Sequence, residues 1–480
     1  MAAYTSYAEP HHARPADNYV DGIGVNTHLT SPAYDASFDK IVKPALKDIG
    51  IRYIRDGFFG GAAFEGRIRE LGLLGIRASL ITSPQSLLDL AGSLGRMSPG
   101  PIAVEGPNEP YLWPITFQGV TGNANLKPFQ IALWNGIKGD PATRGILVLP
   151  FGGDNFKHYL SVGNLEAWCD RGNFHHYTST TGELPGGYAT PPTDGLYIGR
   201  GGYRDSSLLA LVRKITPAKP LWMSESGYST YQGLSSGWDP GVSERAAGRY
   251  FPRITLELFN NNVEKFFLYE LLDGSSNRNG LELNFGMVRK DGSLKPHGRV
   301  LKNMIGLLKD PGPPFIPSTL DYHLTSPVSV KDDSDSKTAE IHQTLLQKRD
   351  GRFYLILWYE AKSYDYLKNA DIQVPDVPVT LTLGSVFAKV NLYRPLDSAG
   401  MMSSQPQRNV LTPITLKVPD HPLVVELVPE GFTTSLAEGR VKAPEGKSEG
   451  FRSRAGMPGM SGRSRGADGR ERRNGRFFNP

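Results

Sequence analysis

The chain has 480 residues, of which 39% are hydrophobic and 21% are charged, so it can bury a large core and a second module. Its net charge of +5 comes from the C-terminus. Residues 440–480 carry eleven Lys or Arg and four Asp or Glu, which leaves −2 on the rest of the chain. Because the positive net charge lies in this C-terminal segment, it excludes no class of partner for the rest of the chain.

Three further features restrict the class of protein. No apolar stretch reaches about 18 residues, so no transmembrane helix is predicted. The segment Met1–Tyr19 has no apolar h-region, so it does not read as a secretory signal. We expect a cytoplasmic protein as written, or an extracellular one if a leader is missing. The single cysteine, Cys169, excludes an intrachain disulfide.

The first three hundred residues alternate apolar, strand-like runs with amphipathic stretches. Eight strands, each followed by a helix or loop, predict an α/β fold of the (β/α)₈ TIM-barrel class. The expected strands are Gly22–Leu29, Arg52–Gly57, Ile76–Thr82, Pro101–Gly106, Gly145–Phe151, Gly172–Tyr177, Pro220–Ser224 and Lys265–Leu272. The expected helices include Phe38–Ile49, Ala63–Leu74, Leu208–Ile215, Ser243–Asn260 and Pro296–Leu308.

A proline-rich connector, Asp310–Pro317, separates this part from a run of short strands. Their spacing predicts an antiparallel β-sandwich as an accessory domain. The expected strands are Tyr322–Val328, Ala339–Leu346, Arg352–Tyr359, Val379–Thr382, Lys389–Arg394 and Pro422–Val428. We therefore expect an N-terminal extension at 1–19, a catalytic barrel at 20–310, a sandwich at 318–430 and a disordered Arg/Gly-rich tail at 431–480.

Glu109 follows the fourth expected strand, in the sequence Gly106-Pro-Asn-Glu-Pro110. A carboxylate at the end of a barrel strand is well placed for chemistry. Tyr111 and Trp113 could form an apolar wall that raises its pKa, as a general acid requires. Asn108 offers an amide that can hydrogen-bond a sugar hydroxyl. A plain turn at the end of a strand is the alternative interpretation.

Glu225 lies at the end of the seventh expected strand, after Leu221-Trp222-Met223. A nucleophilic carboxylate must stay ionised and be held by hydrogen-bond donors. Arg55, at the end of the second strand, is a candidate donor, although it could instead form a structural ion pair with Asp56 or Glu105. Two such carboxylates are what cleavage of a glycosidic bond requires.

These residues resemble the catalytic set of clan A glycoside hydrolases, which are retaining barrel enzymes, and the chain looks most similar to family 39-like or family 5-like members. In that clan an Asn-Glu pair ends strand four, as Asn108-Glu109 does, and a glutamate ends strand seven, as Glu225 does. The resemblance implies that Arg55 contacts the nucleophile. It also implies that His28 lines the sugar site. The segment His175–Tyr177 is expected there as well, and His176 and Tyr177 are its candidate sugar-binding residues.

The eighth strand departs from the clan pattern, which often places a tryptophan there as the floor of the sugar site. Here Tyr269 or Glu270 takes that position. Trp238, after strand seven, is placed to stack on a sugar ring.

No cofactor or metal is expected. The chain has no His-Glu-x-x-His run, and adjacent residues of a strand point to opposite faces, so at most one of His175 and His176 enters the barrel.

The preferred function is a retaining O-glycoside hydrolase acting on β-linked sugars, with Glu109 as acid/base, Glu225 as nucleophile and an oligo- or polysaccharide as substrate. One alternative is a carbohydrate-binding barrel without catalysis. A less favoured alternative is nucleic-acid binding through the basic tail. No membrane partner is expected, and the sequence does not specify an oligomeric state.

Overall fold

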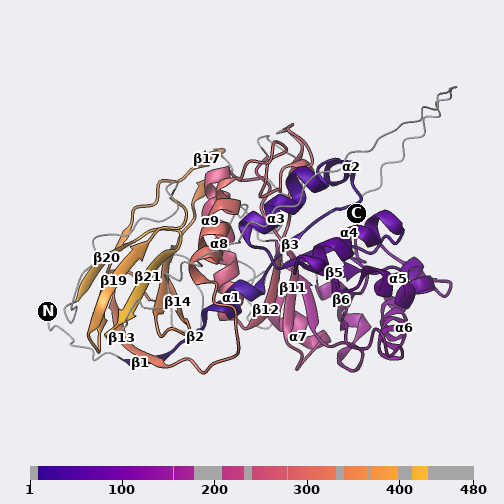
Figure 1. Cartoon of the computed structure of the whole chain (residues 1–480), viewed down its shortest axis with the longest axis horizontal. Helices are drawn as coiled ribbons and strands as arrows, with labels where there is room; N and C mark the ends of the chain where they lie inside the picture. The colour runs from indigo at the N-terminus through magenta and orange to yellow at the C-terminus, as the bar shows by residue number, and fades with distance from the viewer. Residues whose placement is uncertain are drawn as a thin grey trace, which may run out of the picture. The chain divides into compact units, whose positions relative to one another are not determined.

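The computed structural model describes residues 9–154, 156–177, 208–231, 241–277, 279–330, 340–365, 368–397 and 413–430. Its central feature is an eight-stranded sheet in which every neighbouring pair is parallel (Figure 1). In spatial order the strands are β10 (Gly172–His175), β11 (Leu221–Ser226), β12 (Val263–Leu268), β3 (Ile23–Asn26), β4 (Tyr53–Gly57), β5 (Arg77–Ile81), β6 (Pro101–Glu105) and β9 (Leu147–Leu149).

The sheet closes almost completely into a barrel. Between its end strands, β9 and β10, the His175 N–H donates a 2.7 Å hydrogen bond to the Gly153 carbonyl. These eight strands are the eight expected from the sequence, so the TIM-barrel prediction is confirmed. The last strand ends at Leu268, earlier than the expected Leu272, so Tyr269 and Glu270 lie in the loop beyond it.

Amphipathic helices cover the barrel. In α7 the buried residues Leu208, Leu211, Val212 and Ile215 recur at helical spacing, so one apolar face packs inward. Helices α4, α5 and α6 lie on the outer side of β5 and β6 in Figure 1. The α-helices are α1 (Ala16–Gly22), α2 (Pro32–Asp35), α3 (Lys43–Ile49), α4 (Ala62–Leu73), α5 (Leu90–Met97), α6 (Leu126–Lys138), α7 (Leu208–Ile215), α8 (Glu244–Asn260) and α9 (Pro296–Leu308).

Shorter turns of helix complete the connections. They are the π-helix η1 (Phe38–Val42) and the 3₁₀ helices η2 (Pro84–Asp89), η3 (Asn123–Asn125), η4 (Phe156–Val162), η5 (Glu166–Trp168) and η7 (Leu281–Leu283). Two small antiparallel ribbons, β7 (Thr116–Phe117) with β8 (Val120–Thr121) and β16 (Tyr364–Asp365) with β17 (Ala370–Asp371), lie in loops.

Two further sheets form the predicted sandwich. One has the order β1 (Glu9–His12), β13 (Thr319–Thr325), β18 (Val377–Leu383) and β20 (Ile414–Val418). The other has the order β19 (Phe387–Tyr393), β21 (Leu423–Pro429), β15 (Phe353–Glu360), β14 (Glu340–Gln347) and β2 (Arg14–Pro15). The short strands β1 and β2, drawn in indigo in Figure 1, come from the segment expected as an N-terminal extension and pair with β13 and β14.

Strand β15 joins the sandwich to the barrel because its alternate side chains enter two different cores. Leu355 and Leu357 lie in the core between the two sheets, whereas Ile356 and Trp358 lie in the cluster that includes the barrel core. Both faces of the strand are buried, as its apolar sequence predicts.

Helix α8 supplies the polar part of the same junction. The Arg253 guanidinium of α8 binds both oxygens of Glu360 in β15, at 2.8 and 2.9 Å, and both side chains are fully buried.

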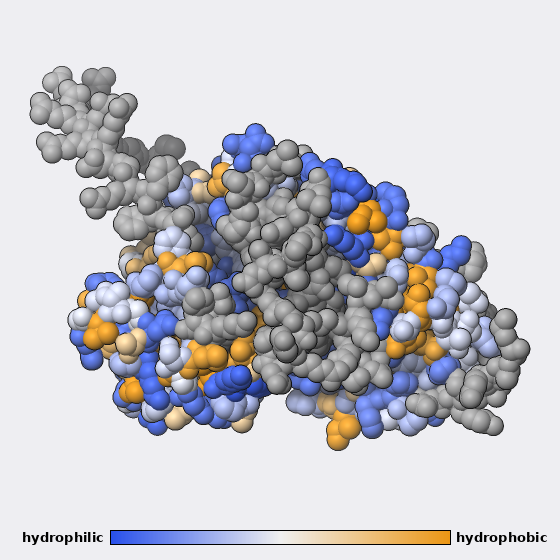
Figure 2. Space-filling view, turned by 180° about the vertical axis from the view of Figure 1, so that it is seen from behind, coloured by the Kyte–Doolittle hydropathy of each residue, from blue (hydrophilic) through white to orange (hydrophobic). Residues whose placement is uncertain are grey.

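The described surface is mixed in character. On the face in Figure 2, hydrophobic residues form several separate groups among hydrophilic ones. Among the described helices, none combines the length and the apolar character needed to cross a bilayer.

Candidate active site

Glu109 lies in a tight turn four residues after β6. Its N–H donates to the Gly152 carbonyl at 3.0 Å, and its own carbonyl accepts from the N–H groups of Leu112 and Trp113. The residue has a φ of +39°, which is uncommon for a side chain other than glycine. Strained residues of this kind occur preferentially at functional sites, where the surrounding contacts hold them.

His175, the last residue of β10, contacts the Glu109 carboxylate. Its Nδ1 lies 2.8 Å from Glu109 Oε1, and its Nε2 lies 3.4 Å from the Arg55 guanidinium. Because arginine can only donate, Nε2 accepts and the Nδ1–H donates to Glu109. Burial lowers the pKa of His175 to about 4, so the ring is neutral near pH 7.

The ring of His175 has room because residue 152 is glycine. A Cβ built on Gly152 would lie 2.4 Å from His175 Nε2, closer than real contacts allow. The same glycine accepts the backbone hydrogen bond of Glu109. Gly152 therefore positions both partners of the Glu109–His175 hydrogen bond.

Glu225, near the carboxyl end of β11, has a donor on each oxygen. Arg55 Nη1 lies 2.8 Å from Oε2, and the Tyr177 hydroxyl donates to Oε1 at 2.6 Å. The side chain is largely buried, and the Arg55 guanidinium that contacts it belongs to strand β4. These contacts fix the carboxylate in one orientation.

The two glutamates face one another across His175. One carboxylate oxygen from each and one nitrogen of His175 all lie within 4.8 Å of one another, and His175 Nδ1 is 3.8 Å from Glu225 Oε2. Such a cluster could in principle hold a metal ion. Because Arg55 already places a positive charge against Glu225, we assign no metal ligands here.

The protonation of Glu109 is set by burial and by Arg55. Burial raises the pKa of Glu109, and the positive charge of Arg55 acts in the opposite direction with a smaller effect. The carboxyl group therefore keeps its proton to a higher pH than an exposed glutamate does. A carboxyl group that is protonated near neutral pH can act as a general acid.

Arg55 is the centre of the polar network on the floor of the barrel mouth. Besides Glu225 it donates to Asn108 Oδ1 at 2.7 Å, to Asn26 Oδ1 at 3.0 Å and to Glu105 Oε1 at 2.5 Å. Since Asn108 turns its carbonyl oxygen to Arg55, its amide nitrogen points the other way. Asn26 in turn donates to the Ser224 carbonyl at 3.2 Å, which ties β3 to β11.

A second polar cluster follows strand β12. His28 Nε2 lies 3.2 Å from the Tyr269 hydroxyl and 3.3 Å from Glu270 Oε2, which also accepts from the Tyr34 hydroxyl at 2.9 Å. Burial raises the pKa of Glu270 well above its usual range and lowers the pKa of His28 to about 4. The His28 ring is therefore neutral near pH 7, and Glu270 keeps its proton to a higher pH than an exposed glutamate does.

This second cluster lies beside the glutamate pair. The Tyr269 N–H donates to the Ser226 carbonyl at 2.6 Å, one residue after Glu225. The Phe285 ring packs edge-on against both Tyr269 and Tyr177, with centroids 5.2 and 6.3 Å away.

Most of the residues expected at the site are therefore brought together, and His176 and Trp113 contact the two glutamates through their backbone. The backbone of His176 donates to the Glu225 carbonyl, but the buried ring that contacts Glu109 belongs to His175. Trp113 is 48% exposed, and its backbone N–H donates to the Glu109 carbonyl at 2.9 Å. Trp238 lies outside the described residues.

Sequence reasoning did not name Asn26 or Asn173, named Glu105 only as an alternative ion-pair partner of Arg55, and left open which of His175 and His176 enters the barrel. Their common signal is a polar side chain inside a run that otherwise reads as a buried strand.

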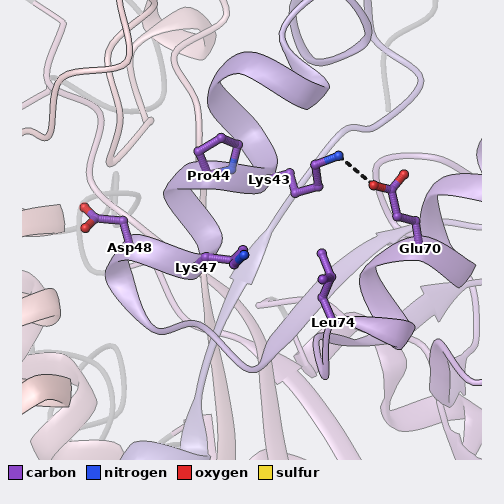
Figure 3. Close-up of a pocket in the computed structure, with 6 residues that line it drawn as sticks. All are labelled: Lys43, Pro44, Lys47, Asp48, Glu70 and Leu74. Carbon is purple, nitrogen blue, oxygen red and sulfur yellow. Dashed lines mark hydrogen bonds and ion pairs between the residues drawn. The ribbon is translucent and has the colours of Figure 1, made fainter. Parts of the chain in front are cut away.

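A separate hollow lies on the outer surface, where helices α3 and α4 approach one another (Figure 3). Its lining is Lys43, Pro44, Lys47, Asp48, Glu70 and Leu74. Lys43 is already paired with Glu70 at 2.6 Å across the hollow. These helix side chains are not those of the barrel mouth, and we assign no ligand to them.

Comparison with known proteins gives structural likenesses only. No family model matches the chain, and no curated protein matches its sequence. A family 39 glycoside hydrolase from the gut symbiont Bacteroides cellulosilyticus WH2 has 14% identity and a TM-score of 0.55, with 86% of this chain and 81% of that chain covered. A glucosidase from Croceicoccus marinus has 11% identity and a TM-score of 0.57, with 88% and 97% covered. The chain therefore shares its overall fold with these two glycosidases, in agreement with the resemblance to clan A.

Proposed function

We propose that this protein is a glycosidase that cleaves β-linked sugars by a retaining, double-displacement mechanism. The observation that carries the proposal is the pair Glu109 and Glu225 at the carboxyl ends of two barrel strands, with carboxylate oxygens within 4.8 Å. Retaining glycosidases have carboxyl groups about 5–5.5 Å apart, whereas inverting ones need roughly 6.5–9.5 Å. The likeness in fold to two glycosidases supports the same class of reaction.

The different surroundings of the two glutamates support different roles. Glu225, with donors on both oxygens, suits the nucleophile that attacks the anomeric carbon. Glu109, whose pKa burial raises, suits the acid that protonates the leaving oxygen. In the second step Glu109 takes a proton from water, and that water releases the sugar from Glu225.

The remaining site residues are proposed to bind the sugar. The amide nitrogen of Asn108 would donate to the hydroxyl beside the anomeric carbon, because its oxygen is held by Arg55. His28, Tyr269 and Glu270 would bind other hydroxyls of the same ring through hydrogen bonds rather than through a stacked tryptophan. Trp113, His176 and Trp238 keep the sugar-binding roles expected from the sequence.

Assays of the purified full chain test the activity. A panel of aryl β-glycosides and plant polysaccharides should include at least one substrate that is hydrolysed. Glu65→Ala provides a matched control, because Glu65 is another buried glutamate paired with an arginine, at α4 and away from the site. Hydrolysis should be lost in Glu225→Ala and retained in Glu65→Ala. A panel without turnover would favour a sugar-binding protein without catalysis.

Azide separates the two roles. Glu109→Ala should still form a glycosyl-enzyme with a good leaving group, and azide should then give a product with retained configuration. Azide should rescue Glu225→Ala, if at all, with inversion, because the anion attacks the substrate directly. NMR of the glycosyl azides reads the configuration, and exchanged outcomes would mean that the acid/base and the nucleophile are reversed.

A further inference from the structure

One buried carboxylate of the site has no part in the proposed reaction. Glu105, the last residue of β6, has no exposed surface. Its Oε1 lies 2.5 Å from Arg55, and its Oε2 accepts from the Asn173 amide at 3.0 Å. Burial disfavours an ionised group in such a place and raises the pKa of Glu105, whereas Arg55 and the Asn173 amide act in the opposite direction. A neutral side chain of the same volume would avoid that cost, so the charge itself calls for an explanation.

Glu105 shares its counter-charge with Glu225. The single guanidinium of Arg55 lies 2.5 Å from one carboxylate and 2.8 Å from the other. Asn26 and Asn108 contribute only amide oxygens to Arg55, and His175 is neutral near pH 7. With Glu105 and Glu225 both ionised, one positive charge on Arg55 faces two negative charges.

We propose that Glu105 is a positioning residue that tunes the reaction by neutralising part of the Arg55 charge. This inference rests on the proposed function and adds a residue to it. With Glu105 ionised, Arg55 still orients Glu225 but leaves the pair of glutamates in a site of net negative charge. Such a site stabilises the positive charge that develops on the sugar ring in an oxocarbenium-like transition state.

The sharing of the Arg55 charge between two carboxylates also affects Glu109, the proposed acid. Arg55 lowers the pKa of Glu109 against the raising effect of burial. If Glu105 lost its charge, the positive charge of Arg55 would act on Glu109 with less compensation. Glu109 would then release its proton at a lower pH and be absent as an acid over part of the working range.

The strands on either side of β6 provide no second counter-charge for Glu105. The strands bonded to β6 are β5 and β9, and their only titratable side chain is Arg77. Arg77 donates instead to the carbonyls of Gly100 and Pro101, at the opposite end of β6. Arg55 and Glu225 are the charged groups that act on Glu105.

The pH profile of kcat/KM tests the proposal. Glu105→Gln should move the alkaline limb, which reports proton loss from Glu109, to lower pH by about one unit. Glu105→Asp keeps the charge and should leave that limb in place. The matched control, Glu65→Gln, removes the charge of a buried glutamate from a distant ion pair and should also leave it in place. If Glu105 had only a structural role, Glu105→Gln would lower kcat/KM at every pH and leave the alkaline limb in place.

Two additions keep the outcome decisive. If Glu105→Gln does not fold, Asn173→Ala removes the donor that favours ionised Glu105, and the limb should move in the same direction by less. A titration of ¹³C-labelled glutamate by NMR reads the pKa of Glu109 without substrate and should show the same shift. Wild-type protein with no hydrolysis would contradict the proposed function alone. An unmoved Glu109 titration in folded Glu105→Gln or Asn173→Ala would overturn the inference.

Discussion

Arg55→Ala is the change whose cost is best worked out from the structure. The side chain is 2% exposed and donates to four side-chain oxygens, two of them carboxylate oxygens, at 2.5–3.0 Å. Its removal leaves Glu105 fully buried without a counter-charge. Breaking a buried ion pair from one side costs about 3–5 kcal/mol, so the free energy of unfolding should fall by that amount at pH 7.

The loss should depend on pH with a definite sign. Burial raises the pKa of Glu105, and Arg55 opposes that rise, so the variant raises it further above the ordinary value of about 4.3. A group with a raised folded-state pKa costs stability where the unfolded chain is ionised, and this cost disappears below the unfolded pKa. The difference between variant and wild type should therefore be full at pH 7 and shrink as the pH falls towards 4.

Urea unfolding followed by tryptophan fluorescence, at pH 7 and at about pH 4.5, measures both effects. The double variant Arg55→Ala/Glu105→Gln should recover part of the loss at pH 7, because the unpaired charge is gone. A loss below about 1 kcal/mol, or one of equal size at both pH values, would refute the reasoning. So would a double variant less stable than Arg55→Ala.

Three further changes test single contacts. Tyr177→Phe removes one donor from the proposed nucleophile and should lower kcat/KM by about 10–100-fold without a comparable loss of stability, and an unchanged rate would exclude a role for the hydroxyl. Gly152→Ala places a methyl group against His175 and should lower kcat while the thermal midpoint falls, whereas full activity would mean that the ring moves freely. Arg253→Ala leaves Glu360 buried without its arginine counter-charge and should cost about 3–5 kcal/mol in urea unfolding; a loss under about 1 kcal/mol would show that the junction does not depend on this pair.

The barrel and its two glutamates could be predicted because their signals are local. Each strand is a short apolar run, and Glu109 and Glu225 stand where two such runs give way to turns. Parallel strands present their carboxyl ends at one face, so position along the chain is enough to bring the two carboxylates together.

The choice between His175 and His176 could not be made in this way. The pairing of β10 with β11 shifts register between Phe174 and His175, and such an irregularity changes which side chains face the interior. All four residues of β10 are buried, so burial does not distinguish the two faces either. The register is a property of the assembled sheet and has no local signature.

The short strands β1 and β2 had no sequence signal for a related reason. Glu9–His12 is polar and does not alternate, and it becomes a strand only because β13 offers an open edge. Strand β20 is different, since Ile414, Leu416 and Val418 alternate with polar residues and all three are buried. This alternation is visible in the sequence, but Ile414–Val418 is not among the strands predicted from it.

The pairing of β1 with β13 and of β2 with β14 has a consequence for biosynthesis. Residues 9–15 leave the ribosome before the barrel strands do, but their partners begin at Thr319 and Glu340. At typical rates of synthesis of 5–20 residues per second, the early strands wait roughly 15–60 s for those partners. During that interval a nascent barrel carries this segment unpaired, and the last-made sheets lock it in place, so residues 9–15 are among the last parts to be fixed.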